Sequence, residues 1–256
     1  MTQPSFALEG KVALVTGASR GIGEAVALGF AHAGADVVVT SRKLPDLEVV
    51  ADKIRKTGRK SLAVAAHIGR LDQLQPLVDK AVAEFGKIDV LVNNAGTSVV
   101  WMPALELEER AWDVIMNLNL KGLFFLSQAV ARVMREKGGG SIINVSSVDG
   151  LKAEANNGAY NISKAAVIMA TKVMAREWAQ YGIRANCIAP GFISTRLMNS
   201  RWEVDPENKP QILKRILLHG VGEPDFITGA MIFLASDASS YVTGETITVD
   251  GGYMLT

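Results

Sequence analysis

The feature that most restricts the fold lies near the N-terminus, where an apolar run leads directly into a glycine-rich turn. Val12 to Thr16 are all apolar or β-branched, which favours a buried strand. Glycines follow at positions 17, 21 and 23, and the next residues have a helical pattern. Gly17, Gly21 and Gly23 permit a tight turn and a close backbone approach, while the helix N-terminus favours an anion. The segment predicts a strand–turn–helix unit that cradles a phosphate group.

The rest of the chain repeats this alternation of short apolar runs with longer helical patterns. Strands are predicted at 12–16, 36–40, 61–65, 89–93, 141–146, 184–189 and 246–249. Right-handed connections through helices place such strands in one parallel sheet. The fold class predicted is therefore α/β, a doubly wound (Rossmann-type) parallel sheet of about seven strands with helices on both faces.

Local signals place several of the helices. Pro45 before the stretch 46–56, followed by Gly58, is typical of a helix with an N-terminal proline and a terminating glycine. Helical spacing predicts a buried face formed by Leu74, Leu77, Val78, Ala81, Val82 and Phe85, ahead of Gly86. Because no Pro- or Ser-rich linker interrupts the alternation, we expect a single domain, 1–256.

Composition excludes several classes of partner and site. The 256 residues carry a net charge of +1 without a run of like charges, so neither nucleic acid nor a membrane is expected as a partner. Met1 to Gly10 has no signal-peptide profile, and no apolar stretch approaches the ~20 residues of a membrane span. Cys187 is the single cysteine and cannot form an internal disulfide. We expect a cytoplasmic protein without a metal site.

A second pattern points to acid/base chemistry. Tyr160 and Lys164 are four residues apart within a predicted helix at 159–178, so both lie on one face. A nearby ammonium favours the phenolate and lowers the pKa of a tyrosine, which is ~10 when unperturbed. Ser147 lies at the end of the strand 141–146, where open α/β sheets bind ligands, and its hydroxyl can polarise a carbonyl. Alone, however, a Tyr and Lys at this spacing are more often a solvated pair or a packing contact.

A serine hydrolase is the alternative from another reaction class. The segment 17–21 reads G-x-S-x-G, the pattern of a nucleophile elbow, with Ser19 at its centre. A hydrolase also requires a histidine after a later strand. His32, His67 and His219 are the only histidines, and none is in an obvious position for that role. The positions of the histidines therefore argue against a hydrolase.

Taken together, the motifs resemble those of the classical short-chain dehydrogenase/reductase family over nearly the whole chain. They are Thr16–Gly23, Asn93-Asn94-Ala95-Gly96, Asn119-Leu120-Lys121-Gly122, Ser147 with Tyr160 and Lys164, and Pro190-Gly191 with Thr195. The resemblance implies that Tyr160 transfers the proton, Ser147 holds the substrate oxygen, and Lys164 binds the nicotinamide ribose. It implies that Asn119 anchors a proton-relay water. It also implies a mobile substrate lid near 195–220.

The resemblance implies a nicotinamide dinucleotide as cofactor. The binding residues predicted are Gly17, Ser19, Arg20, Gly21, Ile22, Gly23, Ser41, Arg42, His67, Ile68, Asn94, Ala95, Gly96, Tyr160, Lys164, Pro190, Gly191, Ile193 and Thr195. The family usually has an aspartate after the third strand, where this chain has His67. That side chain either contacts the adenine or only fills the rim.

The second strand indicates which dinucleotide is used. An NAD enzyme usually has an acidic residue at the end of this strand to bind the ribose, but here Asp36 opens the strand. Arg20, Ser41 and Arg42 can instead surround a 2′-phosphate with charge-assisted hydrogen bonds. The alternative is that Arg42 and Lys43 are solvated loop residues. NADP(H) is the cofactor predicted.

We therefore predict an oxidoreductase that transfers a hydride between NADP(H) and a small carbonyl/alcohol substrate, either a ketone or an aldehyde. Alternatives are a 3-oxoacyl thioester reductase, an NAD-dependent sugar or alcohol dehydrogenase, and a non-catalytic nucleotide-binding relative. Apolar helices near 112–137 and 159–178 favour a homotetramer or homodimer.

The substrate preference is predicted from variable residues around the site. Val99, Val100, Trp101, Met102, Leu197, Met198 and Trp202 are expected to line an apolar pocket, or else to pack among themselves. Asp149 and Glu154 should disfavour anionic substrates if either faces that pocket. Neutral apolar ketones are therefore expected to be preferred over simple sugars and keto acids.

Overall fold

The computed structural model describes residues 5–256 and contains a seven-stranded sheet in which every pairing is parallel. The strands are β1 (Val12–Thr16), β2 (Asp36–Ser41), β3 (Ser61–Ala65), β4 (Val90–Asn93), β5 (Gly140–Val145), β6 (Ile183–Pro190) and β7 (Thr246–Val249). Their spatial order is β3-β2-β1-β4-β5-β6-β7. The predicted fold class is confirmed, and the predicted strand limits differ by at most one residue at either end.

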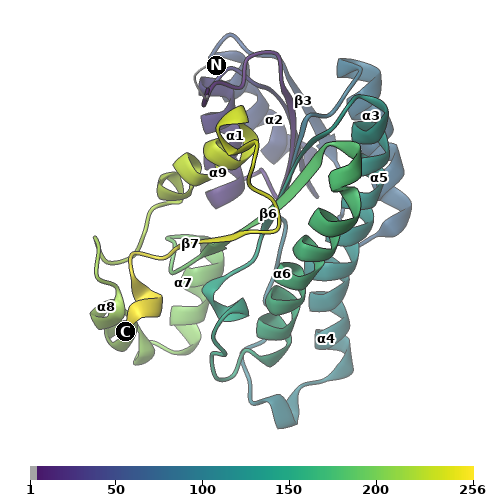
Figure 1. Ribbon diagram of the computed structural model, residues 1–256. Helices are drawn as coiled ribbons and strands as arrows, with labels where there is room; N and C mark the ends of the chain where they lie inside the picture. Colours follow the sequence, from purple (N-terminus) through teal and green to yellow (C-terminus); the bar gives the residue numbers. More distant parts are fainter. Residues whose placement is uncertain (1–4) are drawn as a thin grey trace.

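Helices cover both faces of the sheet (Figure 1). One layer contains α1 (Gly21–His32), α2 (Leu44–Arg55) and α9 (Thr228–Ala235), and the other contains α3 (Leu74–Phe85), α5 (Leu123–Glu136) and α6 (Gly158–Trp178). Each layer encloses its own apolar cluster. Phe30 and Leu47 are fully buried in the first, and Leu126 and Ile142 in the second. This two-sided burial explains why the strands are continuous apolar runs.

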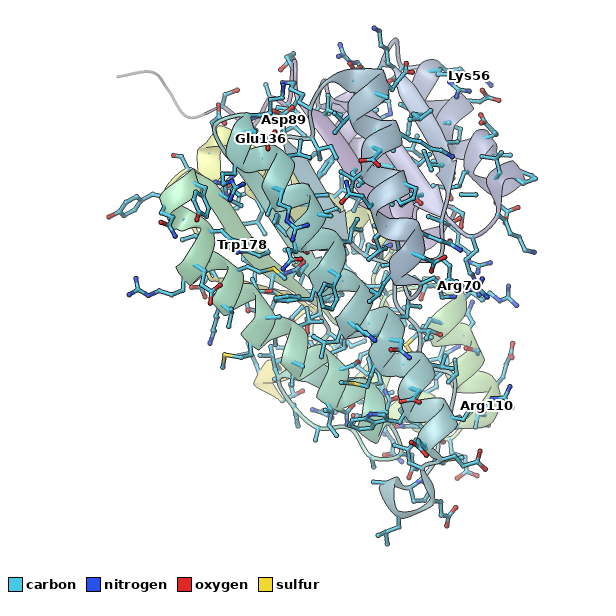
Figure 2. All side chains as sticks on the ribbon, turned by 90° about the vertical axis from the view of Figure 1, so that its right-hand side faces the viewer. Lys56, Arg70, Asp89, Arg110, Glu136 and Trp178 are labelled. Carbon is cyan, nitrogen blue, oxygen red and sulfur yellow. The ribbon has the colours of Figure 1, made fainter. Side chains whose placement is uncertain are left out.

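Two predicted helices differ in detail from the observed ones. The helix expected from Asp46 starts at Leu44, so Pro45 lies inside its first turn. The helix expected at 112–137 is a longer rod that runs past Arg110 to Glu136 (Figure 2). It contains α4 (Glu109–Met116), a π-helical segment (Asn117–Gly122) and α5. The spacing of apolar residues does not reveal the π-helical segment, because that segment is a local change in the hydrogen-bond register of the helix.

The helix α3 matches its predicted buried face closely. Leu74, Leu77, Val78 and Ala81 are buried, whereas Val82 and Phe85 are half-buried against the same cluster. Gly86 ends the helix with a φ of 75°, a left-handed conformation that glycine adopts without strain.

The rod from Glu109 to Glu136 is long and apolar enough by composition to span a membrane, contrary to the expectation that no stretch approaches that length. Half of its most apolar window is buried inside the protein, and α5 packs against α3 and the sheet. Core helices of globular proteins pass the same test. We interpret this rod as a core helix.

The strand order creates the place where a ligand binds. The chain adds β2 and β3 on one side of β1, then returns to place β4 on the other side. At such a reversal the loops after neighbouring strands diverge and leave a crevice at the carboxyl ends of the strands. The glycine-rich turn after β1 and the loop after β4 lie at this point, and Ser147 follows β5 beside it.

Candidate active site

The turn after β1 has the geometry of a phosphate cradle. Gly17 and Gly21 have φ values of 64° and 58°, which side chains other than glycine rarely adopt. A Cβ added to Gly23 would collide with the carbonyl oxygen of Gly17 and the side chain of Asn94. Asn94 donates hydrogen bonds from Nδ2 to the carbonyl oxygens of Thr16 (2.9 Å) and Gly17 (3.3 Å). The loop after β4 therefore fastens the glycine turn so that backbone and helix N-terminus face an anion.

The cradle opens into a cleft of about 1030 Å³ that contains nearly all the predicted site residues. All the predicted cofactor residues line it except Gly23, which packs behind the turn. Ser147, Tyr160 and Lys164 line the same cleft. The described residues that line it thus fit an extended dinucleotide whose far end reaches the Tyr–Lys pair.

Tyr160 and Lys164 face each other as the helical spacing predicts. Lys164 Nζ lies 5.5 Å from the centroid of the Tyr160 ring and donates a 2.8 Å hydrogen bond to the carbonyl oxygen of Val145. Ser147 is buried at the end of β5, and its Oγ accepts a 3.1 Å hydrogen bond from the backbone N–H of Asp149. Since that oxygen acts as the acceptor, its own proton can be donated to a substrate oxygen.

Burial controls the charge of Lys164, which is only 4% exposed. Desolvation lowers the pKa of Lys164 from 10.5 to about 8, while the Cys187 thiol and the Asp149 carboxylate act in the opposite direction. Burial also raises the pKa of Cys187 to about 11, so this thiol is neutral at pH 7. The charge that supports the ammonium at neutral pH is therefore that of Asp149.

Asn119 is the predicted catalytic residue that does not line the cleft. It is fully buried in the π-helical segment and exchanges two hydrogen bonds with the Thr97 backbone, at 2.8 and 2.9 Å. Its Nδ2 also donates to Ser163 Oγ at 3.0 Å. The side chain thus ties the loop after β4 to α6. The proton-relay role implied by resemblance stays a prediction.

Comparisons with known proteins agree with these motifs. A family model described as enoyl-(acyl carrier protein) reductase matches residues 17–254. The 2-dehydro-3-deoxy-D-gluconate 5-dehydrogenase of Escherichia coli is 42% identical over 99% of both chains. A crystal structure of a short-chain type dehydrogenase/reductase from Mycobacterium marinum has 40% identity and a TM-score of 0.92, covering 98% of both chains. The chain belongs to the classical short-chain dehydrogenase/reductase family.

A second structural neighbour of this short-chain dehydrogenase/reductase contains a dinucleotide. It is the gluconate 5-dehydrogenase of Burkholderia cenocepacia in complex with NADP and tartrate, with 39% identity, a TM-score of 0.93 and 98% coverage of both chains. Both the family and the oxidoreductase class are therefore established by full-length similarity and not by isolated motifs.

The adenosine end of this short-chain dehydrogenase/reductase cleft is predominantly basic. The residues that line this end include Arg20, Ser41, Arg42 and Lys43. Asp46 also lines the cleft and is the acidic residue near them in the sequence. Asp36 lies at the opposite end of β2, as predicted, where it forms a 2.9 Å ion pair with Arg59. His67 lines the cleft, and its Nδ1 accepts a 3.1 Å hydrogen bond from Gly69 N–H. Whether His67 also contacts adenine stays a prediction.

The geometry does not favour the hydrolase alternative. Ser19 belongs to the phosphate cradle, and within residues 5–256 no hydrogen bond joins it to a histidine. His32 lies in the last turn of α1, and the ring of His219 packs against that of Phe226; neither histidine lines the cleft. The described residues also contain no group of three or more His, Cys, Asp or Glu side chains that could hold a metal ion.

The substrate end of the cleft matches the predicted apolar lining only in part. Val99, Val100, Trp101, Leu197 and Met198 line it, but Met102 and Trp202 do not. Trp202, on α7 (Arg196–Val204), packs against a small apolar cluster that includes Tyr253 and Ile212 of α8 (Asn208–Arg215). Phe192 and Met198 of this cluster also line the cleft. The sequence pattern could not reveal which face of α7 is turned inward.

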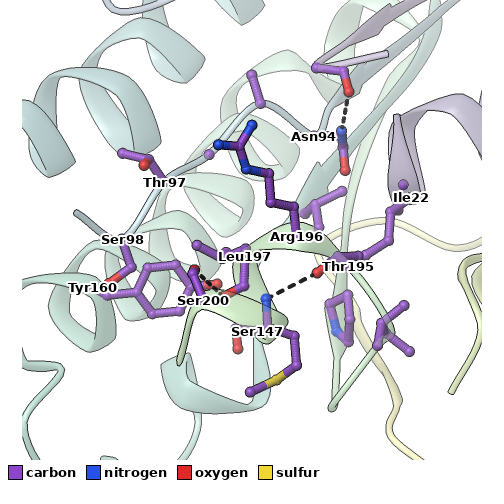
Figure 3. Close-up of a pocket in the computed structure, with 18 of the residues that line it drawn as sticks. Ile22, Asn94, Thr97, Ser98, Ser147, Tyr160, Thr195, Arg196, Leu197 and Ser200 are labelled. Carbon is purple, nitrogen blue, oxygen red and sulfur yellow. Dashed lines mark hydrogen bonds between the residues drawn. The ribbon is translucent and has the colours of Figure 1, made fainter. Parts of the chain in front are cut away.

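Sequence reasoning missed several polar residues of the substrate end. Ser98, Asn157, Arg196 and Ser200 line the cleft together with Asp149. Figure 3 shows Tyr160, Ser98 and Ser147 around the same space as Arg196, Leu197 and Ser200 of α7. Arg196 could have been found, since it directly follows the predicted cofactor contact Thr195. Asn157 had no signal, because only folding brings it to the cleft.

Proposed function

We propose that this protein is an NADP(H)-dependent oxidoreductase that interconverts a ketone or aldehyde and the corresponding alcohol. The observation that carries the proposal is the shared cleft. Its one end is a glycine-rich dinucleotide cradle, and its other end presents Ser147, Tyr160 and Lys164 together. A non-catalytic nucleotide-binding relative would have no need for this second end.

The chemistry follows from the positions of these side chains. The nicotinamide ring, when bound, supplies or accepts the hydride. During reduction Tyr160 gives its proton to the carbonyl oxygen, and Ser147 donates a hydrogen bond to that oxygen. The Lys164 ammonium stabilises the resulting phenolate by its charge, so proton transfer can occur near neutral pH. Asn119, by holding the loop after β4 against α6, keeps the dinucleotide end aligned with the Tyr–Lys pair.

The preference for NADP(H) rests on charge. Arg20, Arg42 and Lys43 place three cations at the adenosine end, and Ser41 adds a hydroxyl donor. An adenosine 2′-phosphate would satisfy these groups through charge-assisted hydrogen bonds, whereas a bare ribose would leave them unused. The NADP complex of the related Burkholderia enzyme supports the same choice.

The substrate end of the cleft is lined by both apolar and charged side chains, and this lining favours two classes of substrate. Val100, Trp101 and Leu197 favour a neutral ketone with a medium-sized apolar or aromatic group, as predicted from the sequence. The second candidate is a sugar acid, favoured by the relatives named above and by Arg196, whose cation lines the cleft. The acyl thioester alternative rests on the description of the matching family model.

We further propose a homotetramer or homodimer, cytoplasmic residence, and a single domain with a lid at 195–220. The lid contains α7 and α8 and covers a small apolar cluster with Phe192 and Tyr253. Exposed apolar side chains on α5 and α6 support self-association, among them Phe125, Ile162 and Met169.

The test combines one substitution with a substrate screen. Purified enzyme is assayed for NADPH oxidation against aryl and alkyl ketones, aldehydes, 5-ketogluconate, simple sugars and 3-oxoacyl thioesters. Tyr160→Phe should lower kcat at least ~100-fold on every active substrate, because the general acid is lost, while the Kd for NADPH changes little. Tyr181→Phe is the control, since Tyr181 does not line the cleft. Wild-type turnover by Tyr160→Phe would refute the catalytic assignment.

A further inference from the structure

A buried carboxylate to which the proposed reaction assigns no contact with the substrate lies beside the catalytic serine. Asp149 is only 7% exposed and lines the cleft. Its backbone N–H donates a hydrogen bond to Ser147 Oγ, and its side chain is close enough to Lys164 to oppose the lowering of that lysine's pKa by burial. A charged side chain that is desolvated at this place carries a large energetic penalty unless polar partners compensate it.

Two further side chains connect Asp149 to the wall of the substrate end. Asn157 is 5% exposed, and its Nδ2 donates a 3.2 Å hydrogen bond to Asp149 Oδ2. Ser98 Oγ donates a 2.9 Å hydrogen bond to Asn157 Oδ1. All three residues line the cleft. The result is a continuous polar wall made from three separate segments of the chain.

The backbone holds this wall in place. Asn157 immediately precedes α6, and its carbonyl oxygen accepts a hydrogen bond from Asn161 N–H. Its neighbour Asn156, with a φ of 62°, accepts a hydrogen bond from Met102 N–H. The loop after β4 is thereby paired with the residues before Tyr160. The polar wall therefore has a fixed position relative to Tyr160 and Ser147.

We propose that Asp149, with Asn157 and Ser98, forms a subsite that binds a hydrogen-bond-donating substituent next to the reacting carbon of the substrate. This inference rests on the proposed reduction of a carbonyl compound at Tyr160 and Ser147. A carboxylate can accept several hydrogen bonds at once, so it can bind a hydroxyl or ammonium group in addition to Asn157. Its negative charge excludes a carboxylate from the same position.

The subsite also gives a sugar acid a preferred orientation. Its hydroxyl groups would lie against Asp149, and its carboxylate would have to lie away from that residue. The cation at Arg196, which enters the cleft from α7, provides a place for it. A substrate whose carboxylate is remote from the reacting carbon is therefore accepted. A substrate whose carboxylate is attached next to the reacting carbon, and so lies against Asp149, is not.

The test uses four ketones that differ only in the substituent. They share the skeleton phenyl–CO–CH2–X, with X as hydroxyl, methyl, ammonium or carboxylate: 2-hydroxyacetophenone, propiophenone, 2-aminoacetophenone and benzoylacetate. The kcat/KM of each is measured with NADPH. Because all four share the Tyr160–Lys164 step, ratios to propiophenone cancel any effect of Asp149 on the charge of Lys164. We expect the hydroxyl and ammonium ketones to exceed propiophenone at least about tenfold, and benzoylacetate to fall below it by a similar factor.

Substitutions then assign the selectivity to Asp149. Asp149→Asn should reduce the ammonium preference at least about tenfold and improve benzoylacetate by a similar factor, while an amide oxygen still accepts from the hydroxyl. Asp149→Ala should abolish the hydroxyl preference as well. Glu154→Gln is the matched control, because it neutralises a nearby acid that does not line the cleft. The Kd for NADPH and the thermal midpoint report on folding.

The outcomes separate this inference from the proposed function. A wild type that reduces the four ketones without discrimination overturns the subsite but not the reaction. Unchanged ratios in both Asp149 variants overturn it as well. A wild type that reduces no carbonyl compound in the screen overturns the proposed function and the inference that rests on it.

Discussion

Lys164 carries its charge in the protein interior. This burial lowers the free energy of unfolding, while it places the ammonium where it can stabilise the Tyr160 phenolate. Its pKa falls from 10.5 to about 8 because burial disfavours the ammonium. Below pH 8 the side chain is protonated in both the folded and unfolded states, so the full burial cost is present. Between about pH 8 and 10.5 only the unfolded state keeps the proton, so this cost is relieved as pH rises.

The first prediction at this scale is that Lys164→Met abolishes turnover and raises thermal stability at pH 7. A shift of this size corresponds to about 2–4 kcal/mol, less the lost hydrogen bond to Val145, which is worth about 1 kcal/mol. The gain in thermal midpoint should be largest below pH 8 and should diminish toward pH 10. Calorimetry of both proteins at pH 6.5, 8 and 9.5 checks the trend. A gain that grew with pH would contradict it.

The second residue-scale prediction concerns Arg42. Arg42→Asp should shift the ratio of kcat/KM for NADPH over NADH at least tenfold toward NADH, because a carboxylate repels the 2′-phosphate and a bond of ~1.5–3 kcal/mol is lost. Lys56→Asp makes the same charge change at the C-cap of α2, away from the cleft, and serves as the control. If the wild type uses NADPH and NADH equally well, the basic residues at the adenosine end of the cleft do not select between them.

At the scale of elements, the strand–turn–helix unit depends on close backbone contact. Gly23 is in the first turn of α1, where an added Cβ would overlap Gly17 and Asn94. The turn, the helix and the loop after β4 are therefore interlocked at one position. Glycine in a helix interior usually destabilises the helix by ~0.5–1 kcal/mol relative to alanine. A glycine is required at position 23 because the close contacts leave no room for a Cβ.

Gly23→Ala is therefore expected to destabilise the protein and to raise the Kd for NADPH at least tenfold, since the turn must move to admit a methyl group. Gly229→Ala is the matched control. Gly229 is in α9, and its added Cβ would meet nothing within 4 Å, so that change should stabilise by about 0.5–1 kcal/mol. Chemical denaturation and fluorescence titration with NADPH measure both effects. Equal behaviour of the two variants would argue against a close-packed cradle.

At the scale of the whole molecule, one helical face has more apolar side chains than the sheet can cover. Phe125, Ile162 and Met169 are 41%, 50% and 59% exposed on α5 and α6. These two helices, which end at Glu136 and Trp178, lie on the side of the molecule turned toward the viewer in Figure 2. Burying this face against a second copy would remove it from water at about 25 cal/mol per Å². A second surface for self-association is β7, which forms an edge of the sheet.

We predict that light scattering finds a dimer or tetramer at micromolar concentration, and that Met169→Glu shifts it toward the monomer. The charge would have to be desolvated in the interface, which costs several kcal/mol. Val49→Glu introduces the same group at an exposed position of α2 in the other layer and should leave the mass unchanged. A purely monomeric wild type would exclude self-association through this face.

The sequence by itself determined the strands, the sheet class, the glycine cradle and the Tyr–Lys pair. These depend on local periodicity and on turn residues, which act within a few positions of one another. The face of α3 and the placement of Asp36 away from the dinucleotide followed for the same reason. The family assignment was equally accessible, since several spaced motifs occur in order.

Only the tertiary structure decided which distant side chains meet. Asn157, Ser98 and Asp149 belong to three segments, and no periodic pattern links them. The π-helical register around Asn119 turns its side chain toward Thr97 and Ser163, and the rotation of α7 brings Leu197 to the cleft but not Trp202. These outcomes depend on long-range packing and hydrogen bonding, because burial and partners are fixed only when the layers close around the sheet.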